Sequence, residues 1–210
     1  MKQYLVYIFL PLMTWAQTDE VNPVPPLLRN LEATNPRVAA SAARSLGVIF
    51  SPGGRSGEEV KQVTDTLMET LGATSANVRR ESASALGAML STAALSTLKE
   101  TVKDADYTVA IAAATAVRKI LPVEDARIYL KEIAGDPAET VQIAAYDAMV
   151  EIAGPNDAAF MVQGLGASNW RIQANSVRGL ERSIQAGARP ESEVFDQVAG
   201  LLGNDVSNVA

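Results

Sequence analysis

A helical repeat of about 31 residues constrains the fold of this chain more than any other feature of its sequence. Each unit is centred on a β-branched residue, here called the anchor. The five anchors are Val38, Val78, Val109, Val141 and Ile172. Their spacing is nearly constant, except that an insertion at Ser51–Glu59 lengthens the first interval. Self-similarity at such a period indicates a stack of small, equivalent structural units.

Apolar and small residues follow each anchor at helical spacing. Another apolar residue stands eight positions after each anchor: Leu46, Leu86, Val117, Met149 and Leu180. Small residues such as Ala42, Ala113 and Ala145 stand four positions after an anchor. This spacing places all of them on one face of an α-helix. We call this the B helix of each unit, and its small residues should allow neighbouring helices to approach closely.

A second apolar series precedes each anchor and predicts an A helix. Its members stand eleven and seven positions before the anchors: Leu27, Leu67, Leu98, Leu130 and Met161, then Leu31, Leu71, Val102, Ala134 and Leu165. A two-helix hairpin cannot bury its apolar stripe alone, so hairpins must stack. The sequence therefore predicts an all-α fold, a right-handed α-solenoid of about five and a half hairpins over residues 27–210.

The turns between helices contain residues that are typical of helix ends. Short polar side chains that can cap free backbone N–H groups stand three positions before four anchors: Asn35, Ser75, Asp106 and Asn169. Gly72, Gly135 and Gly166 stand near the ends of A helices, where we expect a left-handed residue to close the helix.

The last unit is incomplete in this sequence. Val194, Val198, Leu201 and Leu202 predict a sixth A helix, but no full B helix follows it. An uncapped end of a solenoid exposes core residues. We therefore expect either further repeats or self-association at the C-terminal end.

The N-terminus has the features of a targeting segment. Residues 1–16 contain Lys2, a short apolar run and the small residue Ala16, which is the pattern of a cleaved secretory signal peptide. The run is interrupted by Pro11 and is shorter than the roughly 20 residues of a membrane-spanning helix, so no stable membrane span is expected. An uncleaved tether or a buried segment are the alternatives. Residues 17–26 are polar and Pro-rich and are interpreted as a spacer. The sequence thus predicts an exported protein, which is periplasmic, extracellular or held at the cell surface.

Composition excludes several classes of function. The chain of 210 residues has 48% hydrophobic and 20% charged residues, which is typical of a folded protein rather than a disordered one. Its formal net charge of −6 disfavours binding to nucleic acid, because the charge has the wrong sign to replace counterions. With no Cys and no His, the chain lacks thiol nucleophiles, imidazole bases and disulfides.

Motifs that resemble catalytic or ligand-binding sites are incomplete. The Gly-rich segment 51–57 lacks the Lys of a phosphate-binding loop and is followed by Glu58 and Glu59. Asp104 and Asp106 lack the further ligands of a calcium loop. Carboxylates four residues apart, such as Asp147 and Glu151, are usually just solvated. We therefore expect a protein that is not an enzyme, with no catalytic, cofactor-binding or metal-binding residues.

One surface remains as a candidate docking site. Positions six and ten after each anchor should project from successive B helices as a ladder, and Tyr107 and Trp170, two positions before their anchors, should lie on one ridge. Exposed aromatic residues are frequent interface anchors. The candidate partner-binding residues are Arg44, Tyr107, Lys119, Asp147, Glu151, Trp170, Arg178 and Arg182. The alternatives are an ordinary solvated face and aromatic rings that cover the core between repeats.

The repeat units resemble a known family. The first unit contains Asn35-Pro36-Arg37-Val38, then Ala42 and Ser45-Leu46-Gly47, and later units contain Val78-Arg79, Ala85-Leu86-Gly87 and Asp136-Pro137 before Val141. This pattern resembles HEAT repeats, especially the short HEAT-like type of phycobilisome lyase proteins, and extends over about residues 24–210. The resemblance implies an α-solenoid and binding of a protein partner, but not lyase activity. The family's Arg after the anchor is kept only at Arg79, so we expect any charge ladder that the family uses between repeats to be mostly absent here.

These observations favour an exported, non-enzymatic HEAT-repeat scaffold that binds a protein or peptide along its B-helix face. The alternative is an enzyme or an enzyme accessory subunit that holds a small ligand in the concave face. A structural segment of a larger envelope protein is a third possibility. The sequence names no cofactor and no specific partner.

Overall fold

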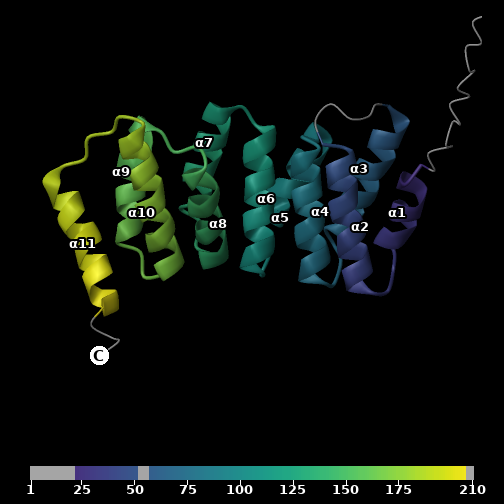
Figure 1. The fold of residues 1–210 in the computed structure, drawn as a ribbon, viewed down its shortest axis with the longest axis horizontal. Helices are drawn as coiled ribbons and strands as arrows, with labels where there is room; N and C mark the ends of the chain where they lie inside the picture. The colour runs from purple at the N-terminus through teal and green to yellow at the C-terminus, as the bar shows by residue number, and fades with distance from the viewer. Residues whose placement is uncertain (1–21, 52–56, 207–210) are drawn as a thin grey trace, which may run out of the picture.

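The protein is a row of stacked helices. The computed structural model describes residues 22–51 and 57–206, and within these ranges all regular structure is helical, with eleven α-helices and two short 3-10 helices. Paired helices stand side by side from α1 to α11 (Figure 1). The expected signal peptide, residues 1–16, lies outside the described residues, as does the segment 52–56 of the predicted insertion.

The helices alternate between two rows, as the repeat predicts. The A helices are α1 (Val24–Leu31), α3 (Glu58–Thr70), α5 (Leu95–Thr101), α7 (Val123–Ile133), α9 (Ala158–Leu165) and α11 (Ser192–Val206). The B helices are α2 (Pro36–Ile49), α4 (Ala76–Ala88), α6 (Tyr107–Ile120), α8 (Glu139–Val150) and α10 (Trp170–Gln185). Short 3-10 helices, Thr92–Ala94 and Pro155–Asp157, lead into α5 and α9. The chain is therefore an α-solenoid, and no described helix is long and apolar enough to span a membrane.

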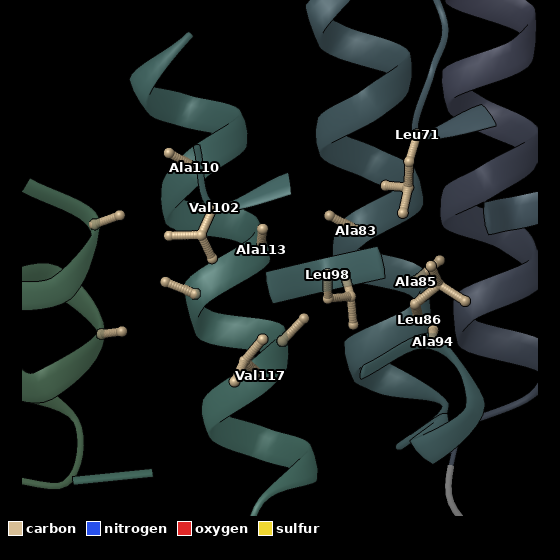
Figure 2. Packing of buried hydrophobic residues seen from close by; sticks show 14 of the residues in the cluster. Leu71, Ala83, Ala85, Leu86, Ala94, Leu98, Val102, Ala110, Ala113 and Val117 are labelled. Atoms are coloured by element: carbon tan, nitrogen blue, oxygen red, sulfur yellow. The ribbon is translucent and has the colours of Figure 1, made fainter. Parts of the chain in front are cut away.

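The repeat positions predicted to be apolar form the core. All five residues that stand eight positions after an anchor are buried, and so are the anchors of the second to fifth units. In the second and third units, Leu86 and Val117 point into the same layer as Leu98 and Val102 of the intervening A helix (Figure 2). Small residues such as Ala83 and Ala113 lie between them, so that the packed helices approach closely. The core is thus continuous from one hairpin to the next.

Two predictions about the first unit were wrong. The anchor Val38 is 39% exposed, because no described helix precedes the first hairpin to cover it. The expected spacer 17–26 ends earlier than predicted, since α1 begins at Val24, and Val24 itself is buried in the core. The prolines that suggested a spacer, Pro25 and Pro26, lie in the first helical turn, where backbone N–H groups have no intrahelical partner.

Helix ends agree only in part with the predicted chemistry. The side chains of Asn35, Asp106 and Asn169 each accept a hydrogen bond from the N–H two residues later, as expected for caps. Ser75 precedes α4 but makes no capping hydrogen bond through its side chain. The described chain has left-handed glycines at Gly57 and Gly187.

The three glycines predicted to be left-handed are not. Gly72, Gly135 and Gly166 have ordinary backbone conformations, because tight i→i−3 hydrogen bonds close these A helices. For example, the N–H of Gly72 donates to Glu69 and that of Gly135 donates to Glu132. The predicted insertion, Ser51–Glu59, is not all loop. Its last two residues, Glu58 and Glu59, lie in the first turn of α3.

The sixth A helix forms as predicted. α11 packs against α9, and the half-buried Val194, Val198 and Leu201 contact the core. The side chain of Leu202 and residues 207–210, where a sixth B helix was expected to start, lie outside the description.

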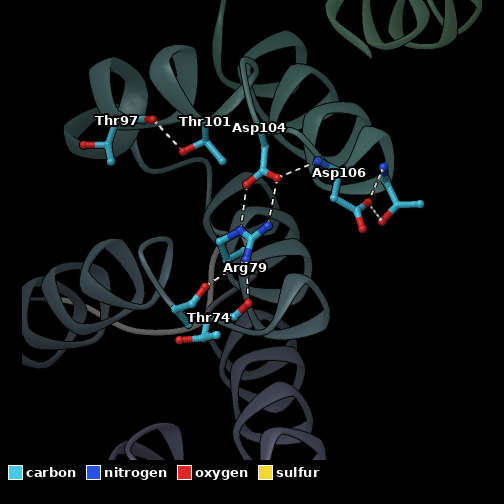
Figure 3. Close-up of polar contacts among 8 residues, drawn as sticks. Thr74, Arg79, Thr97, Thr101, Asp104 and Asp106 are labelled. Atoms are coloured by element: carbon cyan, nitrogen blue, oxygen red, sulfur yellow. Dashed lines mark hydrogen bonds and ion pairs between the residues drawn. The ribbon is translucent and has the colours of Figure 1, made fainter.

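Ion pairs link successive repeats, but among the described pairs only that of Arg79 uses the position after an anchor. The guanidinium of Arg79 on α4 donates to both carboxylate oxygens of Asp104 in the third unit, over 2.7 and 2.9 Å (Figure 3). It also donates to the carbonyl oxygens of Ala73 and Thr74, at the turn of its own hairpin. Other pairs use positions that the family pattern does not mark: Arg44–Glu81, Arg127–Asp157, Lys131–Asp157 and Arg178–Asp147.

The position after the anchor keeps one function even where Arg is replaced. The side-chain amides of Gln142 and Gln173 each donate to a carbonyl oxygen six residues earlier, at Asp136 and Ala167, over 2.7 Å. Arg79 makes the same contact to Ala73. Gln therefore secures the turn between the two helices as Arg does, but without a charge for the next repeat.

Candidate functional site

The B-helix row carries a nearly continuous hollowed surface. Three cavities lie between successive B helices, with volumes of about 280 Å³ between α2 and α4, about 410 Å³ between α4 and α6, and about 410 Å³ over α8 between α6 and α10. The first two share Ser84, and the last two share Ile111. This B-helix face is therefore the candidate site, and the ladder predicted from the sequence lies along it.

Four of the eight predicted residues gather at the cavity over α8. Trp170, Asp147 and Arg178 line it. Tyr107 contacts Arg171, a lining residue that was not predicted from the sequence. The guanidinium carbon of Arg171 lies 4.4 Å from the ring centre of Tyr107 and 4.7 Å from that of Trp170. A cation over an aromatic face is stabilised by the ring's charge distribution. Arg171 thus connects α10 with α6, two repeats away.

The two aromatic rings differ in exposure. Trp170 is 66% exposed, so it does not cover the core between repeats. Tyr107 is half-buried and packs against the core, as the alternative interpretation held for both rings. One ring therefore serves packing, and the other stands at the edge of the cavity with much of its surface open to solvent.

Asp147 has an unusual environment for a surface carboxylate. Burial raises the pKa of Asp147 above its ordinary value, although Arg178 and a hydrogen bond from Asn175 oppose this effect. The contacts are long, since the guanidinium of Arg178 lies 3.9 Å from the carboxylate and the amide of Asn175 lies 3.4 Å from it. Asp147 is therefore incompletely satisfied within the described protein.

The other predicted partner-binding residues of repeats three to five lie near the C-terminal ends of the B helices. Lys119 stands near the end of α6, Glu151 directly follows α8, and Arg182 lies in the last turn of α10. Between them is Arg118, a half-buried residue that the sequence analysis did not select. Burial lowers the pKa of Arg118, with a further decrease from Arg182 and an opposing increase from Glu151. No described residue accepts a hydrogen bond from its buried Nε.

Arg44 is separate from this group. It lies on α2, at the first cavity, and donates to both carboxylate oxygens of Glu81 over 3.1 and 2.9 Å. Arg80 donates to the same carboxylate. The hydrogen bond from Arg44 holds the pKa of Glu81 below its ordinary value, against the opposing effect of burial. The one carboxylate of Glu81 therefore balances part of the positive charge at this end of the face, and Arg44 functions first as a link between repeats.

No group of three or more Asp and Glu side chains that could hold a metal ion occurs in ranges 22–51 and 57–206. Asp157 is 1% exposed and forms ion pairs with Arg127 and Lys131, so it serves to join α7 to the start of α9. What the B-helix face offers is shape, apolar walls and charge, which suit the binding of another molecule.

Comparison with known proteins agrees with this architecture. A family model described as HEAT repeats matches residues 24–118. This match extends over α1 to α6, and the same helical hairpin continues through α10. No curated protein sequence matches the chain.

Solved structures share the fold at low sequence identity. The complex of CpcE and CpcF of phycocyanin lyase from Nostoc sp. PCC7120 is 18% identical, with 95% of this chain and 76% of that chain covered and a TM-score of 0.54. A designed armadillo repeat protein in complex with the peptide (KR)4 is 20% identical, with coverages of 86% and 98% and a TM-score of 0.45. An engineered protein is also 20% identical, with coverages of 89% and 98% and a TM-score of 0.45. The first of these supports the helical-repeat fold and nothing further.

Proposed function

We propose that this protein is an exported, non-enzymatic HEAT-repeat scaffold that binds a protein or peptide partner along its B-helix face. The observation that carries the proposal is the run of three adjoining cavities along the B helices. Solenoid repeats create extended concave surfaces of this kind and use them for binding. Export is proposed from the signal-like residues 1–16 of the sequence.

Energetic considerations favour a macromolecular partner over a small substrate. Each cavity is shallow and shares residues with its neighbour, so an extended ligand can place successive side chains in them. The half-buried Ile111 supplies apolar surface to bury, and the exposed Trp170 supplies an aromatic anchor. Aromatic and Arg side chains are enriched among the residues that dominate interface energies.

Site-specific photo-crosslinking in the native host tests this proposal. A photoreactive residue is placed at Ala174, which is exposed beside the cavity over α8, and a matched one at Ile128, which is 68% exposed on the A helix α7. We expect one defined protein to be crosslinked from Ala174 and not from Ile128. Crosslinking of the partner from Ile128 alone would contradict the proposal.

One observation favours the alternative of a small ligand. The cavity over α8 combines an aromatic wall with two guanidinium groups, an amide and a carboxylate, and convergent polar groups are typical of ligand sites. The same protein, isolated from the native host and examined by native mass spectrometry, distinguishes the two. A bound molecule of low mass that is displaced when Trp170 is changed to Ala would favour an accessory subunit that holds a small ligand.

A further inference from the structure

Charge is sorted between the two helix rows. The five B helices together contain nine basic and four acidic residues, whereas the six A helices contain five basic and eleven acidic residues. The B helices therefore carry a net charge of +5, nine basic minus four acidic residues, on a chain whose net charge is −6.

The basic residues on the B helices of repeats three to five have no carboxylate at hydrogen-bond distance among the described residues. We call the following residues the basic cluster: Arg118, Lys119, Arg171, Arg178 and Arg182. In the described part of the chain, the shortest ion pair that any of these five residues forms is the long contact of 3.9 Å between Arg178 and Asp147. At the other end of the face, by contrast, Arg44 and Arg80 share the carboxylate of Glu81 at hydrogen-bond distance.

Folding alone does not account for this arrangement. Arg118 is half-buried and its Nε has no acceptor among the described residues. Glu151 attracts its charge and Arg182 repels it, but neither accepts a hydrogen bond from Nε. Unsatisfied buried donors are rare in native proteins and call for an explanation. An acidic group placed between these residues would accept from Arg118 and relieve the repulsion.

The helix between the two basic groups, α8, contains acidic but no basic residues. Lys119 and Arg118 lie on α6, Arg171, Arg178 and Arg182 lie on α10, and α8 lies between and packs against both. On α8 the buried Ile143 and the half-buried Asp147 line the cavity, and Ile111 and Trp170 complete its apolar wall. Across the three helices the face therefore changes from basic to apolar and weakly acidic, and back to basic.

We propose that repeats three to five bind an extended acidic segment of a protein partner, with its acidic residues over α6 and α10 and an apolar residue in the cavity over α8. This proposal rests on the proposed function and specifies the chemistry of its partner. Packed helices lie about 8–10 Å apart, so α6 and α10 are separated by roughly 16–20 Å. An extended chain advances about 3.3 Å per residue, so the two groups of acidic residues are centred about five or six positions apart along the segment.

A nucleic acid fits the same face less well. Its phosphates carry about one charge per 1.7 Å of duplex, so they cannot avoid the carboxylates of Asp147 and Glu151 on the middle of the surface. The cavity walls Ile111 and Ile143 are suited to an apolar side chain rather than to a sugar-phosphate backbone. The acidic A-helix row also repels a long polyanion.

Fluorescence anisotropy with synthetic probes tests the proposal on the purified full chain. The probe is a labelled peptide with three glutamates, two leucines and three glutamates in that order, and its counterpart has lysine in place of each glutamate. A third probe is a labelled oligodeoxythymidine of similar length. The variant combines Lys119→Glu with Arg182→Glu, and the matched control combines Arg29→Glu with Lys61→Glu, which changes net charge equally on exposed A-helix positions.

The expected result is binding of the glutamate peptide with an affinity that falls with salt. We expect the Lys119→Glu, Arg182→Glu variant to bind it at least about tenfold more weakly, because attraction becomes repulsion, and the A-helix control to bind as the wild type does. Asp147→Asn should strengthen binding, since it removes the acidic group under the segment. Circular dichroism of each variant confirms that the helices are retained.

Three results would overturn the inference. One is equal binding of the lysine peptide, another is equal loss in the A-helix control, and the third is tighter binding of the oligonucleotide than of the glutamate peptide. If a partner is crosslinked from Ala174 but its binding is unchanged by Lys119→Glu and Arg182→Glu, the scaffold function stands and the acidic partner is excluded. If crosslinking occurs only from Ile128, the proposed function itself fails.

Discussion

Gly87 of α4 packs directly against Ala116 of α6. A Cβ atom built on Gly87 would lie 2.7 Å from the Cβ and 2.8 Å from the Cα of Ala116. The same relationship recurs one repeat earlier, where a Cβ on Gly47 would lie 2.8 Å from the Cα of Ala85. The first three B helices are thus packed backbone to backbone, and the missing side chain of glycine is what permits it.

Gly87→Ala should therefore destabilise the protein. The new methyl group meets backbone atoms that cannot rotate away, so α4 and α6 must separate, and overpacking of this kind costs about 1–3 kcal/mol. Gly72→Ala is the matched control, because its Cβ would come no closer than 3.5 Å to the nearest atom, the carbonyl oxygen of Glu69. Urea denaturation should show a lower midpoint for the first variant and an equal or slightly higher one for the second. Equal loss in both would contradict the packing.

The pair Arg79–Asp104 predicts a specific dependence of stability on pH. The hydrogen bond from Arg79 holds the pKa of Asp104 below its ordinary value, against the opposing effect of burial. The folded state therefore binds fewer protons at this group than the unfolded state does. Its contribution to the free energy of unfolding is complete above the unfolded pKa of about 3.9 and is lost as the pH falls through the lower, folded pKa.

Asp104→Asn should accordingly lower the free energy of unfolding by about 1–3 kcal/mol at pH 7. The difference between wild type and variant should persist down to about pH 4 and shrink below it. Asp65→Asn, on the exposed side of α3, serves as the control and should change stability by less than about 0.5 kcal/mol. A difference for Asp104→Asn that grows on acidification would show that the ion pair does not stabilise the fold.

The part of the fold that the sequence determines most clearly is the set of buried positions. Periodicity alone locates Leu86, Val117 and Met149, because each repeat must place the same face toward its neighbours, and all three are fully buried. It fails at Val38, where burial depends on a neighbouring hairpin that the described chain does not provide. It also fails at Val24, where the prolines of the first turn conceal the start of a helix.

The candidate site was predictable only in outline. The ladder positions lie on the B-helix face as expected, but the contact of Arg171 with both Tyr107 and Trp170 joins residues two repeats apart. Such contacts depend on how sharply the stack curves, which is set by the volumes of many side chains and not by the repeat period. Arg118 was missed for a related reason, since its environment includes Glu151 and Arg182 from the next two repeats.

Leu86→Ala tests the predicted register of the B helices. Leu86 is 0% exposed and lies in the layer between α4 and its neighbours (Figure 2), so truncation should cost about 2–5 kcal/mol. Ser84, two residues earlier, is exposed on the B-helix face, and Ser84→Ala should stay within about 0.5 kcal/mol of wild type. Similar denaturation midpoints for the two variants would show that the assigned register is wrong.

Export predicts a processed N-terminus. If residues 1–16 are a cleaved signal peptide, the mature protein begins near Gln17. Edman sequencing or mass spectrometry of the protein from its native host measures this directly. A mature chain that still begins at Met1 would exclude cleavage and favour a tether or a buried segment.

Among the charged residues described, Asp157 is the one whose replacement should lower the free energy of unfolding most. Its carboxylate is 1% exposed and lies 3.0 Å from Nε of Arg127 and 2.7 Å from Nζ of Lys131, and it accepts from the backbone N–H of Gly154 over 2.9 Å. Asp157→Leu leaves two cations of α7 without their shared partner. Removing one member of a buried ion pair typically costs about 3–5 kcal/mol.

The other partner of Arg127 provides the control for Asp157→Leu. Glu124 pairs with Arg127 but has a side chain that is 78% exposed, and exposed pairs contribute little. Glu124→Gln should therefore change the free energy of unfolding by less than about 1 kcal/mol. Hydrogen exchange adds a spatial readout, since loss of Asp157 should speed exchange in α7 and α9 more than in α2 and α4. Uniform acceleration along the whole solenoid would instead indicate that the repeats unfold as one cooperative unit and that the ion pair has no local role.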